Sequence, residues 1–357
     1  MRYMIYGLIL ICCMLSLSRA SVNVKQIQMQ NDKRLTGQIY DPAFCPSKPF
    51  IVSFERQSGD QRQLFVYNSR TKDILSVSSQ NKTPVSSSDI GDLLELESLE
   101  DYSSFDGQLH WRPVLDTRGR QWFVFVSSGE SKNYDLYLNY LDKKGRLGAK
   151  PLQISQPGTE HYPRWAPDGG KLAFVSRGDQ GMDLFVCYDM SAILQRADAA
   201  SFQAERITRN PYDDNFPAWS PDGRFIAFQE SRVEDDIKNA GIALLPVTQP
   251  GQHYKALRLT QELDEFNEYK PSWSPDGQYI AFYVDHHPLT RSSDTQYQDI
   301  SALQLTRNVQ SGRIEGGRVM RGYSRRVAEN VIPALNRGPQ WALFADQASQ
   351  PFIAYVA

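Results

Sequence analysis

The sequence predicts an all-β protein, a six-bladed β-propeller made of four-stranded antiparallel blades. The main observation is a recurring stretch, read as "YPRWAPDGGKLAF" from Tyr162, "FPAWSPDGRFIAF" from Phe216 and "KPSWSPDGQYIAF" from Lys270. A second observation is its regularity, because the tryptophans follow one another every 54 residues, at Trp165, Trp219 and Trp273. A fixed period of this size indicates a repeat architecture, and four short strands per repeat are typical of a propeller blade.

Each copy reads as a strand, a tight turn and a second strand. Pro fixes φ, Asp can accept a hydrogen bond from the following backbone, and Gly accepts a positive φ, so Pro-Asp-Gly favours a turn. The run "FIAF" at 225–228 is β-branched and aromatic, which is typical of a strand. We expect a third strand at positions such as 183–188 and a fourth at positions such as 206–208 or 257–260. The tryptophan ends the first strand, where its large apolar ring suits packing between blades.

Three weaker copies, at 43–54, 109–128 and 339–356, bring the number of units to six. The aromatic residues that anchor the units are, in chain order, Phe44, Trp111, Trp165, Trp219, Trp273 and Trp341. The sixth unit stops after its second strand, so we expect strands within residues 22–37 to complete this last blade. Such closure would protect strand edges that otherwise template aggregation.

The N-terminus carries a predicted export signal. Arg2 supplies positive charge, 5–17 is an apolar run, and "SRA" at 18–20 suits a signal peptidase. We therefore expect 1–20 to be a signal peptide and 21–357 to form a single propeller in the periplasm. The apolar run is shorter than the roughly 20 residues that span a bilayer. The alternative is that the segment stays as an uncleaved membrane anchor.

The composition suits a soluble globular protein, here expected to be a monomer. The 357 residues include 39 basic and 41 acidic side chains, and 41% are hydrophobic. A net charge of −2 without a basic stripe gives no support for nucleic-acid binding. We expect no cofactor and no nucleophilic catalysis, because the sequence has neither G-x-S-x-G nor a phosphate-binding glycine loop. Cys45 and Cys187 fall in different units, so we expect buried thiols rather than a disulfide.

The pattern P-x-W-[SA]-P-D-G-x-x-[IL]-A-F, clearest across 162–283, resembles the blade signature of TolB-type propellers of the Tol–Pal envelope system. The resemblance implies a periplasmic, non-enzymatic protein-binding module whose partner is an envelope protein, such as a peptidoglycan-associated lipoprotein. Similar blades occur in oligopeptidases and oligogalacturonate lyases, so the alternative is a propeller enzyme such as a metal-dependent oligosaccharide lyase. TolB proteins carry an α/β domain before the propeller, and we expect none here.

A candidate binding site lies five residues before the anchoring aromatic. Four consecutive units have an acidic residue at this offset: Asp106, Glu160, Asp214 and Glu268. If the units are radial, these carboxylates ring one mouth of the central channel. Their mutual repulsion would favour a cation, a basic side chain of a partner, or protonation. The alternative is that each carboxylate caps the turn before its own strand.

Two long loops, 229–241 and 285–299, are expected to open on the same rim. The second loop carries His286 and His287, and His161 follows one of the rim carboxylates. Histidine beside carboxylate can bind a transition metal. No diagnostic ligand spacing is present, so the three histidines are assigned to partner binding rather than to a metal site.

Residues 80–106 form an insertion between the first two blades. Within it, 87–101 combines N-capping residues with apolar residues at helical spacing, which predicts a short acidic amphipathic helix. This helix would act either as a lid packed on the propeller or as a docking surface for a partner.

Overall fold

The computed structural model describes fourteen segments of the chain: 39–58, 61–77, 104–128, 133–155, 159–196, 199–234, 237–252, 255–260, 266–286, 298–307, 314–319, 328–331, 340–342 and 352–354. In these segments strands dominate, beside one helix, α1 (Ser191–Arg196), and a 3-10 turn at Ala199–Ser201. The all-β prediction is confirmed. The predicted signal peptide, the strands within 22–37 and the helix within 87–101 lie outside the described residues.

Five units of four strands follow one another along the described chain. The first two comprise β1 (Ile39–Cys45), β2 (Lys48–Ser58), β3 (Gln61–Asn68) and β4 (Ile74–Val77), then β5 (Ser104–Trp111), β6 (Gln121–Ser127), β7 (Asp135–Leu141) and β8 (Leu152–Gln153). The next two comprise β9 (His161–Trp165), β10 (Leu172–Arg177), β11 (Met182–Cys187) and β12 (Glu205–Arg206), then β13 (Asp213–Trp219), β14 (Phe225–Glu234), β15 (Ile237–Pro246) and β16 (Leu257–Arg258). The fifth comprises β17 (Phe266–Trp273), β18 (Tyr279–His286), β19 (Gln298–Arg307) and β20 (Ile314–Val319), with β21 (Ala328–Val331) also paired to β19.

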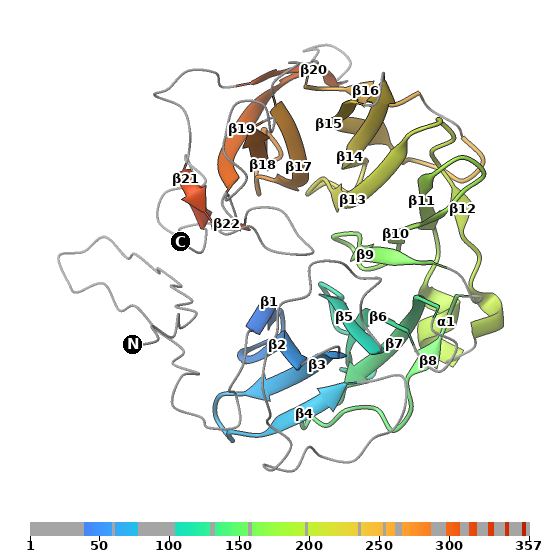
Figure 1. Ribbon diagram of the computed structural model, residues 1–357. Helices are drawn as coiled ribbons and strands as arrows, with labels where there is room; N and C mark the ends of the chain where they lie inside the picture. Colours follow the sequence, from blue (N-terminus) through green and yellow to red (C-terminus); the bar gives the residue numbers. More distant parts are fainter. Residues whose placement is uncertain are drawn as a thin grey trace, which may run out of the picture.

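The units are arranged around a common centre, with the first strand of each, from β1 to β17, nearest to it (Figure 1). Within each unit the strands are antiparallel, while β3 and β5 join the first two units through a short parallel pairing. After the fifth unit, β22 (Gln340–Ala342) pairs with β23 (Phe352–Ala354), with Trp341 opposite Ile353. An antiparallel pair of strands is therefore present where the first two strands of a sixth unit were expected, and the sixth blade itself stays a prediction. Its completion by the N-terminal strands stays a prediction.

The Pro-Asp-Gly stretch forms the predicted turn. Gly223 lies in the left-handed region at φ 67°, and its N–H donates to the Ser220 carbonyl. The Asp222 carboxylate accepts a hydrogen bond from the Arg224 N–H at 3.1 Å. The same glycine position has φ 68° in the neighbouring units, at Gly169 and Gly277. Only glycine adopts this conformation without strain, which explains the fixed turn residue.

The tryptophans pack between neighbouring units, as expected. Trp219 belongs to a core cluster that combines Ala173 and Val186 of the third unit with Phe228 of the fourth. Its indole N–H donates to the carbonyl of Arg164, on the innermost strand of the preceding unit, at 3.0 Å. The core is therefore made of apolar layers between successive sheets.

The innermost strand of each of the five four-stranded units also contains a β-bulge that the sequence analysis did not predict. At each bulge two residues oppose one on the second strand, and the first of the two has a positive φ. These residues lie three before the anchoring aromatic: Asp41 (46°), Gln108 (54°), Tyr162 (51°), Phe216 (53°) and Lys270 (53°). A non-glycine residue in this conformation costs on the order of 1 kcal/mol. In four units a proline follows, where its missing N–H matches the interrupted ladder.

The two cysteines of the propeller are free thiols, each buried in a different core cluster. Burial raises the pKa of Cys45 and of Cys187, so both thiols stay protonated and behave as small apolar residues. Separately, no helix in the described part of the chain has the length and apolar character needed to span a bilayer.

Candidate functional site

The predicted acidic residues lie near the beginning of the innermost strands. We call this end of the sheets the rim. Asp214 of β13 pairs with Glu230 of β14, and Glu268 of β17 pairs with Val284 of β18. The β14–β15 turn follows at the same end, where Glu234 pairs with Ile237. The ends of the second strands β14 and β18 are thus on the same rim as the acidic residues.

The carboxyl groups do not form an exposed ring at this rim. Asp214 is 0% exposed, and Glu160 and Glu268 are each 7% exposed, whereas Asp106 is half-buried. The named partners of Glu160 and Asp214 come from strands and connections next to each of them, not from the other members of the set. The structure therefore places these carboxyls inside the blade boundaries, and their role in partner or cation binding stays a prediction.

Glu160 lies just before β9, against the side chains of Ser176 in β10 and Ser155, which follows β8. The Ser176 hydroxyl donates to Glu160 Oε1 at 3.0 Å. Burial raises the pKa of Glu160 to about 7, and the negative charge of Asp135 adds to this rise, while hydrogen bonds from Ser176 and Ser155 oppose it. Near neutral pH this carboxyl is therefore divided between its charged and neutral forms.

The pKa of Asp214 is raised further above its ordinary value than the pKa of Glu160. The Asn210 side-chain amide donates to Asp214 Oδ2 at 2.9 Å, while Oδ1 is buried without a hydrogen-bond partner. Burial, followed by the negative charges of Glu230 and Asp183, raises the pKa of Asp214 to about 8. Asp183 shares Thr208 with this site, because the Thr208 hydroxyl donates to Asp183 Oδ1 at 3.2 Å. Asp214 consequently carries a proton at neutral pH.

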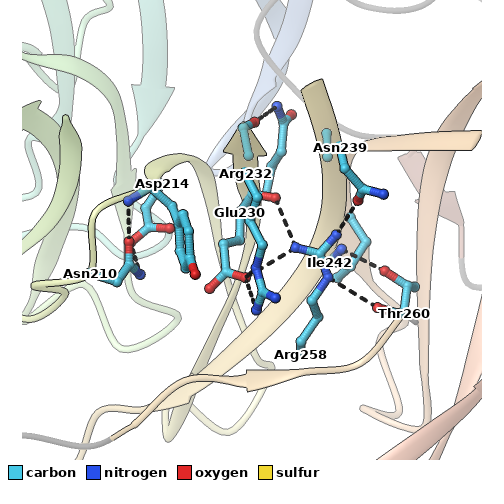
Figure 2. A network of polar contacts seen from close by, with 12 residues as sticks. Asn210, Asp214, Glu230, Arg232, Asn239, Ile242, Arg258 and Thr260 are labelled. Carbon is cyan, nitrogen blue, oxygen red and sulfur yellow. Dashed lines mark hydrogen bonds and ion pairs between the residues drawn. The ribbon is translucent and has the colours of Figure 1, made fainter. Parts of the chain in front are cut away.

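Beside Asp214, a polar network holds the fourth blade together (Figure 2). Glu230 Oε1 accepts from Arg232 at 2.8 Å and from Arg258 at 3.1 Å. Arg258 reaches further, to the side-chain oxygen of Asn239 at 2.6 Å and the backbone oxygen of Thr260 at 3.2 Å. The guanidinium of Arg258 thus ties β16 to both long strands of the blade.

The sequence analysis missed this network. Its signal was the recurrence of an arginine two residues before a threonine in the fourth strand, at Arg206 with Thr208 and at Arg258 with Thr260. Both arginines bind acidic side chains, since Arg206 forms an ion pair with Asp183 at 2.8 Å.

The expected loop at 229–241 is mostly not a loop. β14 continues to Glu234 and β15 begins at Ile237, and their residues pair without interruption from Phe225 opposite Pro246 to Glu234 opposite Ile237. The charged sequence suggested a loop, but pairing with a long partner strand and the Arg258 contacts favour a hairpin. In the other connection, β18 extends to His286 and β19 begins at Gln298.

Of the three predicted histidines, the structure describes the side chain of His161 alone. His161 packs against Tyr134, with ring centroids 4.9 Å apart, and against Tyr162 at 5.7 Å. Burial lowers its pKa to about 4, so the imidazole is neutral. The backbone of His286 ends β18 opposite Phe266, and His287 lies outside the described residues. Within the segments that the structure describes, no group of three or more histidine, cysteine or acidic side chains is arranged to hold a metal ion.

Comparison with known proteins supports the fold. No protein-family model matches the chain. An uncharacterized peptidase YuxL of Bacillus subtilis is 30% identical over 158 residues, and the Tol-Pal system protein TolB of Alcanivorax borkumensis is 32% identical over 109 residues. These matches cover 37% and 30% of this chain but 22% and 23% of the two relatives.

A solved structure of a putative TolB from Agrobacterium tumefaciens matches 89% of this chain and 90% of its own, with a TM-score of 0.50 and 15% sequence identity. This likeness concerns the fold, and it extends over nearly the whole length of both chains. Together with the repeated signature and the ring of four-stranded sheets, it shows that the chain has a β-propeller fold similar to that of the putative TolB.

Proposed function

We propose that this TolB-like propeller is an exported, periplasmic protein-binding module without enzymatic activity, and that its rim captures an envelope protein. The observation that carries the proposal is that the rim combines a hairpin held by ion pairs with exposed polar residues. The β14–β15 hairpin is held by Arg258 and Glu230. Arg209 and Pro211, which precede β13, and Asp213, its first residue, are exposed. Exposed polar connections on a rigid scaffold are suited to recognising a protein surface.

The predicted site residues have different parts in this proposal. Asp106 is half-buried, so it takes the direct contact with a cation or a basic partner segment. The buried side chains of Glu160, Asp214 and Glu268 support the contact surface from behind, and Asp214 is in its neutral form there. The histidines at 161, 286 and 287 are proposed to border the contact.

A propeller enzyme is the second candidate. It is favoured by the partial match to a protein named as a peptidase and by Glu160, whose pKa of about 7 suits proton transfer near neutral pH. Elemental analysis of the purified protein separates the two candidates. A stoichiometric transition metal, together with cleavage of acidic oligosaccharides, would favour the lyase alternative over the binding module.

Crosslinking in the cells that produce the protein tests the rim directly. A photo-crosslinking residue replacing exposed Arg209 should give a protein adduct, whereas one replacing exposed Lys144, on the turn after β7, should not. The double variant Asp106→Asn with Asp214→Asn should reduce the yield from position 209, and added salt should reduce it further because exposed charges are screened. Equal yields from both positions would argue against partner capture at the rim.

A further inference from the structure

At the end of the sheets opposite the rim, one turn exposes large aliphatic side chains. This turn, at 112–120, joins β5, which runs away from the rim and ends at Trp111, to β6. Within it, Val114 is 40% and Leu115 is 45% exposed. No other large hydrophobic side chain in the described part of the chain is exposed. The turn therefore departs from the burial of apolar side chains in the rest of the described blades.

The backbone of this turn is held by contacts, so the exposure does not result from a loose connection. The Arg112 guanidinium donates to the Gly169 carbonyl of the third blade at 2.8 Å and to the Val114 carbonyl at 2.9 Å. It also lies near Asp168, whose negative charge acts on it. The positions of Val114 and of Leu115 after it are thus fixed relative to the neighbouring blade.

Three exposed cations lie beside the two aliphatic side chains. Arg118 belongs to the same turn, while Lys143 and Lys144 belong to the turn after β7, which ends opposite the beginning of β6. The two turns are in contact, because a Cβ atom at Gly119 would lie 2.6 Å from Lys143 Cε. We call this connected surface the basal patch, and its members are Val114, Leu115, Arg118, Lys143 and Lys144.

The positive charge of the basal patch is not balanced by the acidic side chains next to it. Asp116 forms an ion pair with Arg120 at 2.6 Å, and Asp142 forms one with Arg146 at 2.7 Å. The three cations of the patch form no ion pair with another described residue. Because the chain as a whole has a net charge of −2, the excess of positive charge is local.

Apolar side chains flanked by unbalanced cations match the chemistry of an anionic bilayer surface. There, lipid phosphates lie within about 5–10 Å of the acyl chains, so one surface supplies both kinds of contact. The long lysine and arginine side chains can reach the phosphates while shorter aliphatic side chains enter the interface. We propose that the basal patch docks the propeller on an anionic phospholipid surface, with Val114 and Leu115 at the boundary between headgroups and acyl chains.

The neighbouring blade favours a broad lipid surface over a short acidic segment of a protein. Arg70 and Lys72, in the turn between β3 and β4, are exposed as well, and β3 runs parallel to β5, so this turn is at the same end of the sheets. A planar surface meets the turns of two blades at once. Docking at this end leaves the rim open, so the proposal goes beyond the partner capture proposed above and does not depend on it.

Sedimentation with lipid vesicles tests the docking. The purified protein should bind vesicles of phosphatidylglycerol and phosphatidylcholine in equal parts at least tenfold more tightly than vesicles of phosphatidylcholine alone. Added salt should weaken the binding, because it screens exposed charges. Equal binding to both kinds of vesicle, or binding to neither, would overturn the proposal.

Charge reversal connects the binding to the basal patch. Lys143→Glu with Lys144→Glu should weaken binding to the anionic vesicles at least tenfold. The matched control, Arg177→Glu with Arg209→Glu, makes the same change in net charge at exposed positions near the rim and should leave binding within twofold. All four positions are exposed, so both variants should melt like the unmodified protein. Equal losses in the two variants would show that net charge, not the patch, drives the binding, and would refute the site.

A fluorophore that responds to polarity tests the apolar part of the contact. Attached to Leu115→Cys, it should emit at shorter wavelength when anionic vesicles are added, whereas the same label on Arg177→Cys should not change. The native thiols of Cys45 and Cys187 are buried, so they do not compete for the label. An unchanged emission at position 115 contradicts entry of this turn into the interface.

An acidic peptide distinguishes the lipid surface from a protein partner. A synthetic peptide with the sequence of residues 87–101, which is rich in aspartate and glutamate, serves as the probe. Calorimetric titration should detect no binding of this peptide that Lys143→Glu with Lys144→Glu abolishes. Binding with that sensitivity would assign the basal patch to an acidic protein segment and would refute the membrane proposal.

Discussion

At the scale of the residue, buried carboxyls determine how stability responds to pH. Asp214 holds its proton up to about pH 8 in the fold, whereas in the unfolded chain it releases it near 3.8. Between these values the unfolded state binds fewer protons than the folded state. The contribution of Asp214 to stability is therefore most favourable below pH 3.8. It falls as the pH rises from 3.8 to about 8, and it is constant above that value.

The substitution Asp214→Asn should remove much of this pH dependence. Asparagine keeps the side-chain oxygen that accepts from Asn210, but its amide does not ionise as the pH changes. Urea unfolding at pH 5 and at pH 8 gives the decrease in the free energy of unfolding between these two values. This decrease should be smaller in the variant than in the unmodified protein, by up to about 1.4 kcal/mol per pH unit. Asp213→Asn, at an exposed position on the same strand, is the matched control. A variant with the slope of the unmodified protein would mean that Asp214 ionises normally.

At the scale of the element, the first strand and the turn after it have separate energetic parts. Trp219 fills the space between two blades, while Asp222 accepts from the Ser220 hydroxyl and the Arg224 N–H within the turn. One interaction buries a large apolar ring, and the other organises a few exposed residues.

Trp219→Ala should destabilise the protein by about 3–5 kcal/mol, because it leaves a cavity between blades. Asp222→Ala should destabilise it by about 1 kcal/mol, because it removes turn hydrogen bonds. Trp219→Phe, which loses the bond to Arg164 but keeps an aromatic ring, should fall between them. Urea unfolding measures all three, and a larger effect for Asp222→Ala than for Trp219→Ala would reverse the assignment of core and turn.

Much of each element could be predicted from local sequence. Tryptophan, Pro-Asp-Gly and a short apolar run each determine a feature of one or two strands, and their repetition indicated the sheet units. The bulges could not be found this way, because Tyr162 and Phe216 carry no local preference for a positive φ. The extension of β14 past Gln229 was also missed, since it depends on Arg258, which lies far along the chain.

The candidate site was less predictable, because it too depends on contacts between residues that are far apart along the chain. The offset from the tryptophan located the acidic residues correctly at the rim. Their exposure depends on side chains from other strands, such as Ser176 beside Glu160 and Asn210 beside Asp214. Burial of these carboxyls, and with it their protonation, therefore follows from tertiary packing rather than from the repeat.

At the scale of the whole molecule, stability depends on contacts between neighbouring sheets. Among the described residues, the four larger core clusters each join adjacent units, such as Trp111 with Ile51 between the first and second blades and Trp273 with Ala227 between the fifth and fourth. A blade with an open side lacks half of these contacts. Completion of the last blade is therefore expected to matter for the entire ring.

Deleting the residues before Gln38 should lower the melting temperature and cause association through exposed strand edges. The matched control begins at Val22, which removes the predicted signal peptide and Ser21 and should melt like the mature protein. Thermal melts and light scattering measure both effects. If the version that begins at Gln38 stays monomeric with an unchanged melting temperature, the N-terminal strands do not close the ring.

The tryptophan hydrogen bonds have a consequence for how such a chain can change in evolution. The indole N–H groups of Trp111, Trp219 and Trp273 donate to the carbonyls of Ala43, Arg164 and Ala218, each located just before the anchor of the preceding unit. A main-chain carbonyl is offered by any residue. A duplicated gene segment that encodes one unit therefore brings its own donor and finds an acceptor in its new neighbour, so the number of blades can change without compensating mutations at the junction.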